Sequence, residues 1–157
     1  MKKFKSQRSF NIDWILVNEL AIGRAPKYEQ DILKMRDEGI VSVLSLCRED
    51  EAESPNQMRD LFRCERFILP DHKTGRIPSI EELNQAISVL AELKKNGPIF
   101  VHCIAAMERS PLVCMAWLIK EHNLKPQQSL DYMMQIHPGT NPLAEQFELL
   151  HEIKYQP

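Results

Sequence analysis

The chain has 157 residues and a formal net charge of −2. We expect one domain over residues 1–157, which is long enough to bury a core without disulfides or a metal. The near-neutral charge provides no field that would recruit nucleic acid. No uncharged run approaches the roughly 18 residues of a membrane span, and no signal peptide opens the chain, so we expect a cytoplasmic protein with no membrane contact. We also expect a monomer, and a flexible basic terminus over residues 1–9.

Helical and apolar segments alternate along the chain and predict an α/β fold with a central, mostly parallel sheet of about four to five strands covered by helices. In the first half of the chain we expect a hairpin over residues 10–22, a helix over 28–38, a strand over 40–46, a solvated acidic loop over 48–54, a short helix over 56–62 and a strand ending at Pro70. A helix then begins at the capping box of Ser79 and Glu82 and ends at Gly97. It is followed by a strand over 98–102, a buried helix over 112–121, a helix from Pro126 and a last helix over 144–154.

The segment from Cys103 to Arg109 carries the strongest chemical signal. It lies between the predicted strand that ends at His102 and a predicted helix with Ser110 as N-cap and Pro111 as first residue. At such a junction successive backbone N–H groups form an anion-binding nest, and an arginine adds a planar pair of hydrogen bonds. The positive field also favours a thiolate, so Cys103 is predicted to be a nucleophile acting on a phosphate. The alternative is a cysteine that is merely packed at a strand end.

Transfer of a phosphoryl group to a thiolate requires a proton for the leaving group, so a carboxylic acid is expected near Cys103. Asp71 follows the predicted strand that ends at Pro70, which places it at the same sheet edge. An aspartate after proline is also common in turns, and both interpretations stay open here.

These residues resemble the cysteine-dependent dual-specificity and tyrosine phosphatases, and the resemblance covers nearly the whole chain. It implies a phosphatase-type Cys-x5-Arg loop and a cysteinyl-phosphate intermediate. Cys103 would be the nucleophile, Arg109 the phosphate clamp and Asp71 the acid and then the base. It further implies that Ser110 hydrogen-bonds the thiolate and that His102 orients the cysteine. No cofactor and no metal would be required.

Two positions depart from the family pattern inside the substrate-binding loop formed by Ile104, Ala105, Ala106, Met107, Glu108 and Arg109. Ala106 stands where the family usually has glycine, which serves an unusual backbone conformation. Glu108 places a carboxylate beside the phosphate site, which is unfavourable unless it points away or pairs with a basic residue. The resemblance also places Asn141 and Gln146 near the site. Their residue types favour a capping turn and an exposed helical amide instead.

The four cysteines at 47, 64, 103 and 114 lack C-x2-C spacing, which argues against zinc and against a thioredoxin-type pair. Cys47 ends the strand predicted over residues 40–46 and would reach the same sheet edge as Cys103. Some phosphatases of this kind have a second cysteine there that traps the oxidised nucleophile. Cys47 is therefore a possible redox partner, although most buried cysteines are inert.

The single loop arginine, with Glu108 beside it, disfavours a lipid or inositol phosphate substrate. Lys73, Arg76, His72 and Arg24 could supply a positive rim, which favours a phosphorylated protein or peptide as partner. The resemblance implies action on phosphotyrosine, phosphoserine or phosphothreonine. One alternative is a phosphate-binding module that recognises phosphoproteins without turnover. Another, an arsenate reductase or rhodanese-like enzyme, is disfavoured by the position of the cysteine loop.

Overall fold

The computed structural model describes residues 9–157, and its centre is a five-stranded sheet in the order β1-β2-β5-β3-β4. The strands are β1 (Asp13–Leu16), β2 (Leu20–Gly23), β3 (Ser42–Ser45), β4 (Arg63–Arg66) and β5 (Ile99–His102). Only β1 pairs antiparallel, with β2 across the hairpin, and the other three pairings are parallel. The expected hairpin and the mostly parallel sheet are confirmed.

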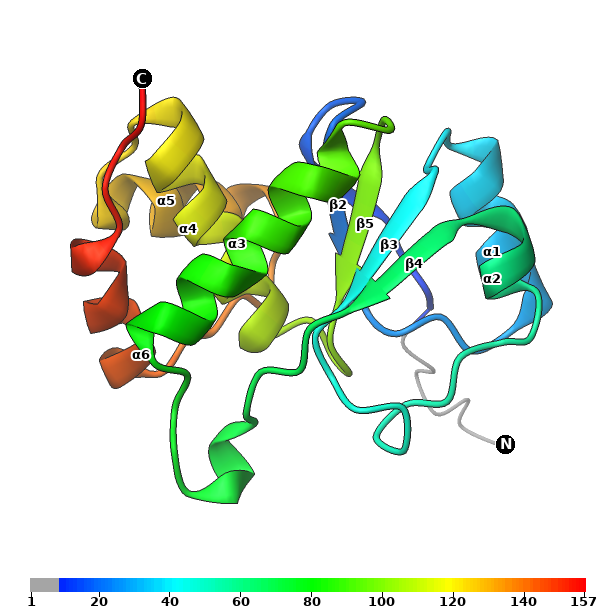
Figure 1. Cartoon of the computed structure of the whole chain (residues 1–157), viewed down its shortest axis with the longest axis horizontal. Coiled ribbons are helices and arrows are strands. Elements are labelled where there is room, and N and C mark those ends of the chain that lie inside the picture. The colour runs from blue at the N-terminus through cyan, green and yellow to red at the C-terminus, as the bar shows by residue number, and fades with distance from the viewer. Residues whose placement is uncertain (1–8) are drawn as a thin grey trace, which may run out of the picture.

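Helices cover both faces of this sheet (Figure 1). On one side lie α3 (Ile80–Lys94), α4 (Arg109–His122), α5 (Pro126–Ile136) and α6 (Ala144–Leu149), and on the other lie α1 (Glu29–Asp37) and α2 (Met58–Leu61). Two short 3-10 turns lie at His72–Thr74, before α3, and at Leu150–Glu152, after α6. Ser79 and Glu82 form the expected capping box of α3.

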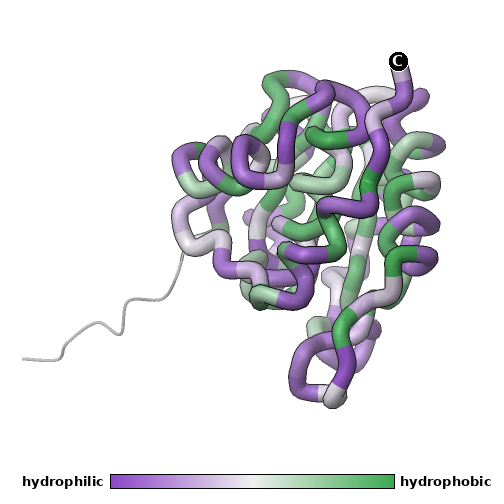
Figure 2. Tube along the Cα trace, turned by 90° about the vertical axis from the view of Figure 1, so that its left-hand side faces the viewer, coloured by the Kyte–Doolittle hydropathy of each residue, from purple (hydrophilic) through white to green (hydrophobic). Residues whose placement is uncertain are grey.

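Each face of the sheet has its own apolar core. The larger core joins the buried faces of α3 and α4 to inward side chains of the strands, such as Leu44 and Val101. The smaller core packs Ile32 and Met35 of α1 against Val43 and Phe100. Figure 2 accordingly shows hydrophobic segments inside the molecule and hydrophilic ones on its outer turns and on the loop that projects below. Because both faces are covered, β5 is buried along its whole length. The packed strand therefore holds its carboxyl end, where Cys103 follows, in one position.

Two element boundaries differ from the sequence prediction. The strand expected to end at Pro70 ends at Arg66, because β3, its hydrogen-bonding partner, ends at Ser45. Beyond it the chain stays extended, and Leu69 N–H donates to Leu46 O at 2.9 Å. The helix after the cysteine loop begins at Arg109 with Glu108 as N-cap, so the prediction of Ser110 as N-cap was wrong. The Ser110 hydroxyl is directed instead at Cys103.

The last helix is also shorter than expected, since α6 ends at Leu149 and passes into a 3-10 turn. Within residues 9–157, no helix has both the length and the apolar character needed to cross a bilayer. The predicted basic terminus, apart from Ser9, lies outside the described residues.

Candidate active site

Cys103 directly follows β5, and the loop from Cys103 to Glu108 leads into the N-terminus of α4. Its side chain is only 4% exposed, and its Sγ lies 3.2 Å from the Ser110 Oγ. The hydroxyl can donate to a thiolate, and the N-terminal end of α4 carries the positive end of the helix dipole. The predicted contact between Ser110 and the cysteine sulfur is present.

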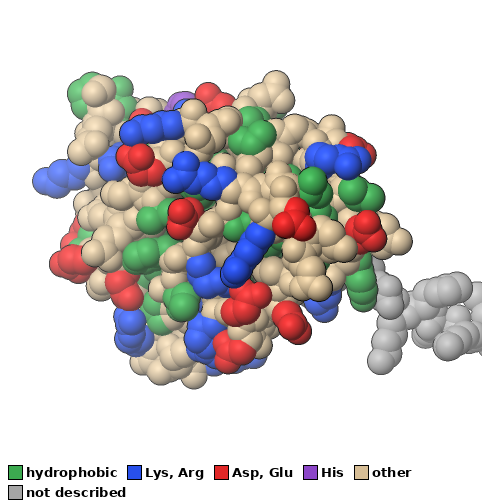
Figure 3. Space-filling model, turned by 45° about the vertical axis from the view of Figure 1, so that its right-hand side comes forward, with side chains coloured by type: hydrophobic (Ala, Val, Ile, Leu, Met, Phe, Trp, Pro, Cys, Tyr) green, Lys and Arg blue, Asp and Glu red, His purple; other side chains and the backbone are tan. Residues whose placement is uncertain are grey.

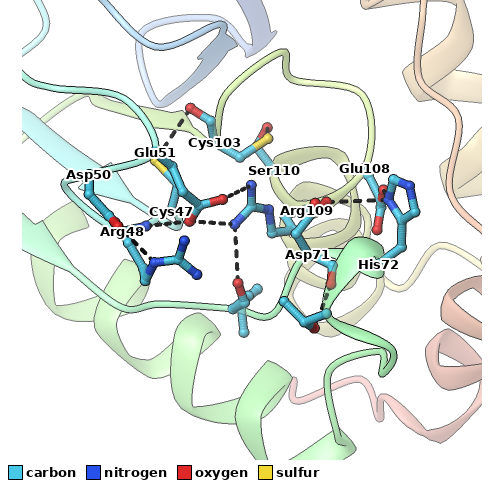
Figure 4. A network of polar contacts seen from close by, with 12 residues as sticks. Cys47, Arg48, Asp50, Glu51, Asp71, His72, Cys103, Glu108, Arg109 and Ser110 are labelled. Atoms are coloured by element: carbon cyan, nitrogen blue, oxygen red, sulfur yellow. Dashed lines mark hydrogen bonds and ion pairs between the residues drawn. The ribbon is translucent and has the colours of Figure 1, made fainter.

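The Arg109 guanidinium is buried and is held by Glu51 and a backbone carbonyl (Figure 4). Its Nη1 and Nη2 donate to Glu51 Oε2 and Oε1 at 3.3 and 3.1 Å, and Nη1 also donates to Leu69 O at 3.2 Å. Burial alone would lower the pKa of Arg109, but the hydrogen bonds that Arg109 donates to Glu51, together with the nearby negative charges, outweigh burial and raise the pKa. The cation is therefore permanent and is fixed in one orientation.

Glu51 is the principal site residue that the sequence analysis missed. The loop over 48–54 was expected to be solvated, yet the Glu51 side chain is only 11% exposed. Burial raises its pKa, but hydrogen bonds from Arg109 and from the Arg48 backbone reverse this, so the pKa is lowered and the carboxylate stays ionised. The segment over 48–54 holds four acidic residues but no local signal that Glu51 is the buried one, because its partner lies 58 positions away.

His102 lies beneath the loop and is fully buried. Its Nδ1 is 2.8 Å from Cys103 O, which can only accept a hydrogen bond, so Nδ1 carries the proton. Its Nε2 then accepts from the Ser45 hydroxyl at 2.7 Å. Burial lowers the pKa of His102 to about 4, which matches this neutral tautomer. The expected role in orienting the cysteine through backbone contacts agrees with this geometry.

The carbonyl groups of the loop are bound from outside. Ala25 N–H donates to Ile104 O at 3.0 Å, and Asn141 N–H donates to Met107 O at 2.8 Å. His137 Nε2 contacts Ala106 O at 2.6 Å. With its carbonyls turned outward, the loop can direct N–H groups at an anion. Asn141 thus supports the loop through its backbone, and His137 is a second residue to which the sequence analysis gave no role.

Ala106 adopts a left-handed conformation with φ of 57°. This is the conformation for which glycine would be preferred, and for a residue with a Cβ it costs about 1–2 kcal/mol. The loop keeps its shape despite the substitution, because the Ala106 carbonyl is held by His137 and its side chain is buried in the core.

Glu108 lies on the opposite side of Arg109 from Glu51 (Figure 4). Its Oε2 is 2.6 Å from His72 Nδ1, and its Oε1 accepts from Gln146 Nε2 at 2.7 Å. Both carboxylate oxygens are therefore engaged away from Arg109. Gln146 is fully buried, so the interpretation of it as an exposed helical amide was wrong.

Asp71 sits just before the 3-10 turn at His72–Thr74 and is part of the same network. Its Oδ1 lies 3.3 Å from His72 Nδ1, and its charge acts on Arg109, whose pKa it helps to raise. Asp71, Cys103 and Glu51 thus all interact electrostatically with one guanidinium. The structure brings together the nucleophile, the cation and the acid that the sequence analysis singled out.

The predicted positive rim and the predicted redox partner are the remaining features of the site. Arg76 forms a bidentate ion pair with Glu82 on α3, so it does not extend freely over the site. Lys and Arg side chains alternate with Asp and Glu on the face shown in Figure 3, without a large patch of one sign. Cys47 Sγ lies 3.6 Å from Cys103 O, and burial raises its pKa, so its redox role stays a prediction.

Among the described residues, one group could hold a metal ion, since ligand atoms of Asp71, His72 and Glu108 lie within 4.8 Å of one another. The hydrogen bond between His72 and Glu108 accounts for the position of two of these three side chains.

The catalytic-domain model of the dual specificity phosphatases matches residues 23–156. This match covers the sheet from the end of β2 onward, the cysteine loop and every helix. The chain therefore belongs to the dual specificity phosphatase family.

Two curated relatives indicate the breadth of that family. The chain is 23% identical to phosphatidylglycerophosphate phosphatase PTPMT2 of Arabidopsis thaliana, over 94% of this chain and 68% of the relative. It is 28% identical to dual specificity protein phosphatase 2 of Mus musculus, over 69% of this chain but only 32% of that longer protein.

Solved structures show the same fold. Tk-PTP in its active form aligns with a TM-score of 0.77 at 22% identity, covering 91% of this chain and 95% of the other. PTPMT1 in complex with PI(5)P aligns with a TM-score of 0.75 at 19% identity, covering 88% and 91%.

The first prediction concerns the ion pair between Glu51 and Arg109. Glu51→Gln leaves a buried cation without its counter-charge, so we expect a loss of about 3 kcal/mol in the free energy of unfolding. Inorganic phosphate or vanadate should restore more stability to this variant than to wild type, because the anion supplies the missing charge. Thermal unfolding with and without the anion measures both effects. Glu53→Gln, an exposed neighbour in the same loop, is the control. Equal stability of the two variants would contradict the assignment.

The second prediction concerns the left-handed conformation at position 106. Ala106→Gly relieves its strain, which offsets the lost methyl burial and the added chain entropy, so stability should change by less than about 0.5 kcal/mol. Ala105→Gly has no such relief, because its φ is not positive. We expect it to cost about 1 kcal/mol. Denaturant unfolding compares the two variants, and a larger loss for Ala106→Gly would show that the backbone is not strained there.

Proposed function

We propose that this chain is a phosphate-monoester hydrolase that works through a cysteinyl-phosphate intermediate. One observation carries the proposal: the Cys103 sulfur lies within hydrogen-bond distance of Ser110 at the N-terminus of α4, beside a buried and oriented Arg109. A protein that only bound phosphate would have no use for a thiol there. It would also not need Asp71 at the same edge.

In the first step the Cys103 thiolate attacks phosphorus. The S–P bond forms while the bond to the leaving oxygen breaks, and Asp71 transfers its proton to that oxygen. Arg109 and the loop N–H groups bind the equatorial oxygens on which charge accumulates. In the second step Asp71 takes a proton from water, the water oxygen attacks phosphorus and the S–P bond breaks. Ser110 donates to the thiolate as it leaves.

For the substrate we propose a phosphorylated protein or peptide. The loop supplies one cation, and the neighbouring Arg76 and His72 are already engaged with Glu82 and Glu108. A polyanionic headgroup would find few partners there. A hollow of about 400 Å³ beside the loop, lined in part by Arg24, Met107 and Pro138, offers room for residues next to the phosphorylated one.

A lipid phosphate monoester is the second candidate. It is supported by the relative PTPMT2, which is named a phosphatidylglycerophosphate phosphatase and aligns with 94% of this chain. Ile104 and Met107 of the loop are each 39% exposed and could contact apolar parts of such a substrate.

The proposal is tested by hydrolysis of para-nitrophenyl phosphate in the presence of EDTA. Wild type should turn over, Cys103→Ser should be inactive, and Arg109→Lys should lose at least about 100-fold in kcat/KM, because lysine cannot form the planar pair of hydrogen bonds. Vanadate binding measured on Cys103→Ser reports whether the site stays folded. A wild-type protein that binds vanadate without turnover would instead indicate a binding module.

Substrate class is decided by comparing kcat/KM for phosphotyrosyl and phosphothreonyl peptides with that for phosphatidylglycerophosphate in mixed micelles. We expect the peptides to be preferred by at least about 10-fold, equivalent to 1.4 kcal/mol. A preference for the lipid would replace the protein substrate with the second candidate and leave the hydrolase mechanism intact.

A further inference from the structure

Asp71 lies on a loop that has little to hold it. Residues 72–76 are all exposed, and the loop projects from the body of the molecule (Figure 1). Its internal hydrogen bonds join Thr74 to Asp71 O and Gly75 N–H to His72 O, all within the turn itself, and the ion pair of Arg76 with Glu82 fixes only its far end. A general acid must be placed to within a fraction of an ångström, and an exposed loop does not provide this by itself.

Among the described residues, Glu108 makes the one side-chain link between this loop and the cysteine loop. Its Oε2 is 2.6 Å from His72 Nδ1, and its side chain is only 13% exposed. Because His72 follows Asp71 directly and its Nδ1 also lies 3.3 Å from the Asp71 carboxylate, fixing the imidazole fixes the position of the acid.

Gln146 holds the Glu108 side chain in place. Gln146, fully buried on α6, donates to Glu108 Oε1 at 2.7 Å. The amide oxygen of Gln146 accepts from Leu143 N–H at 2.8 Å, so the amide cannot rotate without losing a helix cap. Glu108 is also the N-cap residue of α4, next to Arg109. The chain of contacts therefore connects a buried core residue to the acid.

We propose that Glu108 and His72 are positioning residues that hold Asp71 in place for proton transfer, an inference that rests on the proposed function. Glu108, the carboxylate that would be unfavourable beside a phosphate, is in this view the anchor of the acid loop. Neither residue transfers a proton to substrate. Their removal should weaken acid catalysis while leaving phosphate binding intact.

The test compares two aryl phosphates in EDTA. Phenyl phosphate has a poor leaving group that needs the proton, whereas difluoromethylumbelliferyl phosphate releases a phenol acidic enough to leave as the anion. We expect His72→Gln and Glu108→Gln to lose about 10–100-fold in kcat/KM on phenyl phosphate, part of the range that a general acid contributes. On the umbelliferyl ester His72→Gln should stay within about twofold of wild type, and its vanadate affinity should do the same. Glu108→Gln changes a residue of the substrate-binding loop, so for this variant we expect only a much smaller loss on the umbelliferyl ester than on phenyl phosphate. The parameter kcat/KM reports the first chemical step, in which Asp71 acts as acid.

Two control variants and one double variant separate a positioning role from a merely structural one. His122→Gln and Glu121→Gln make the same substitutions at exposed positions near the other end of α4, roughly 20 Å away at 1.5 Å per residue, and should leave both substrates unchanged. In Asp71→Asn the acid is gone, so adding His72→Gln should cause little further loss on phenyl phosphate.

Losses that are equal on both esters, or that add fully to those of Asp71→Asn, would show a merely structural role and overturn the inference. His72→Gln and Glu108→Gln variants that match the controls would overturn it as well, while an active wild type would leave the proposed function standing. A wild-type protein inactive on both esters would overturn the two together.

Discussion

The buried guanidinium of Arg109 is the constraint on which the rest of the site depends. A cation with a 3% exposed side chain needs a fixed partner before any phosphate arrives, and Glu51 and the Leu69 carbonyl provide it. These partners come from the loop after β3 and from the extended segment after β4. The order of the parallel strands therefore brings together, at one edge, groups that are 40 and 58 positions from Arg109 in sequence.

The two residues that depart from the family pattern are accommodated by contacts outside the loop. The left-handed backbone conformation of Ala106 costs free energy of folding, and His137 holds the Ala106 carbonyl in place. Glu108 is turned away from Arg109 and engages His72 and Gln146. The three supporting residues lie after α5 (His137), on α6 (Gln146) and before α3 (His72), so the cysteine loop is stabilised by distant elements as well as by its own geometry.

Much of the fold was predictable because its signals are local. Periodicity and capping residues located α3, and the apolar run before Cys103 located β5. Cys103 and Arg109 were found from spacing, since strand, loop and helix follow one another directly, whereas the contact of Ser110 with the cysteine was implied by the resemblance. Glu51 and His137 could not be found this way, and Gln146 was placed near the site only by the resemblance. Each acts through a partner at least 31 positions away, and nothing in the residue type distinguishes a buried carboxylate or amide from an exposed one.

Substrate choice depends on the residues around the cysteine loop rather than on the loop itself. Relatives at 23% and 28% identity carry names for a lipid phosphatase and a protein phosphatase, yet both are compatible with the same loop. In the proposed mechanism the chemistry at phosphorus depends on Cys103, Arg109 and Asp71. Selection would depend on the surrounding surface, where charges of both signs alternate. The reaction is therefore a property of the site, and substrate choice a property of its rim.

The most direct test of the account is to trap the covalent intermediate. Wild type mixed with para-nitrophenyl phosphate, quenched within milliseconds and digested, should yield a peptide in which Cys103 carries one phosphoryl group. Mass spectrometry would locate it, and Cys103→Ser should yield none. Turnover that continues without any phosphorylated cysteine, or phosphate found on another residue, would contradict the account.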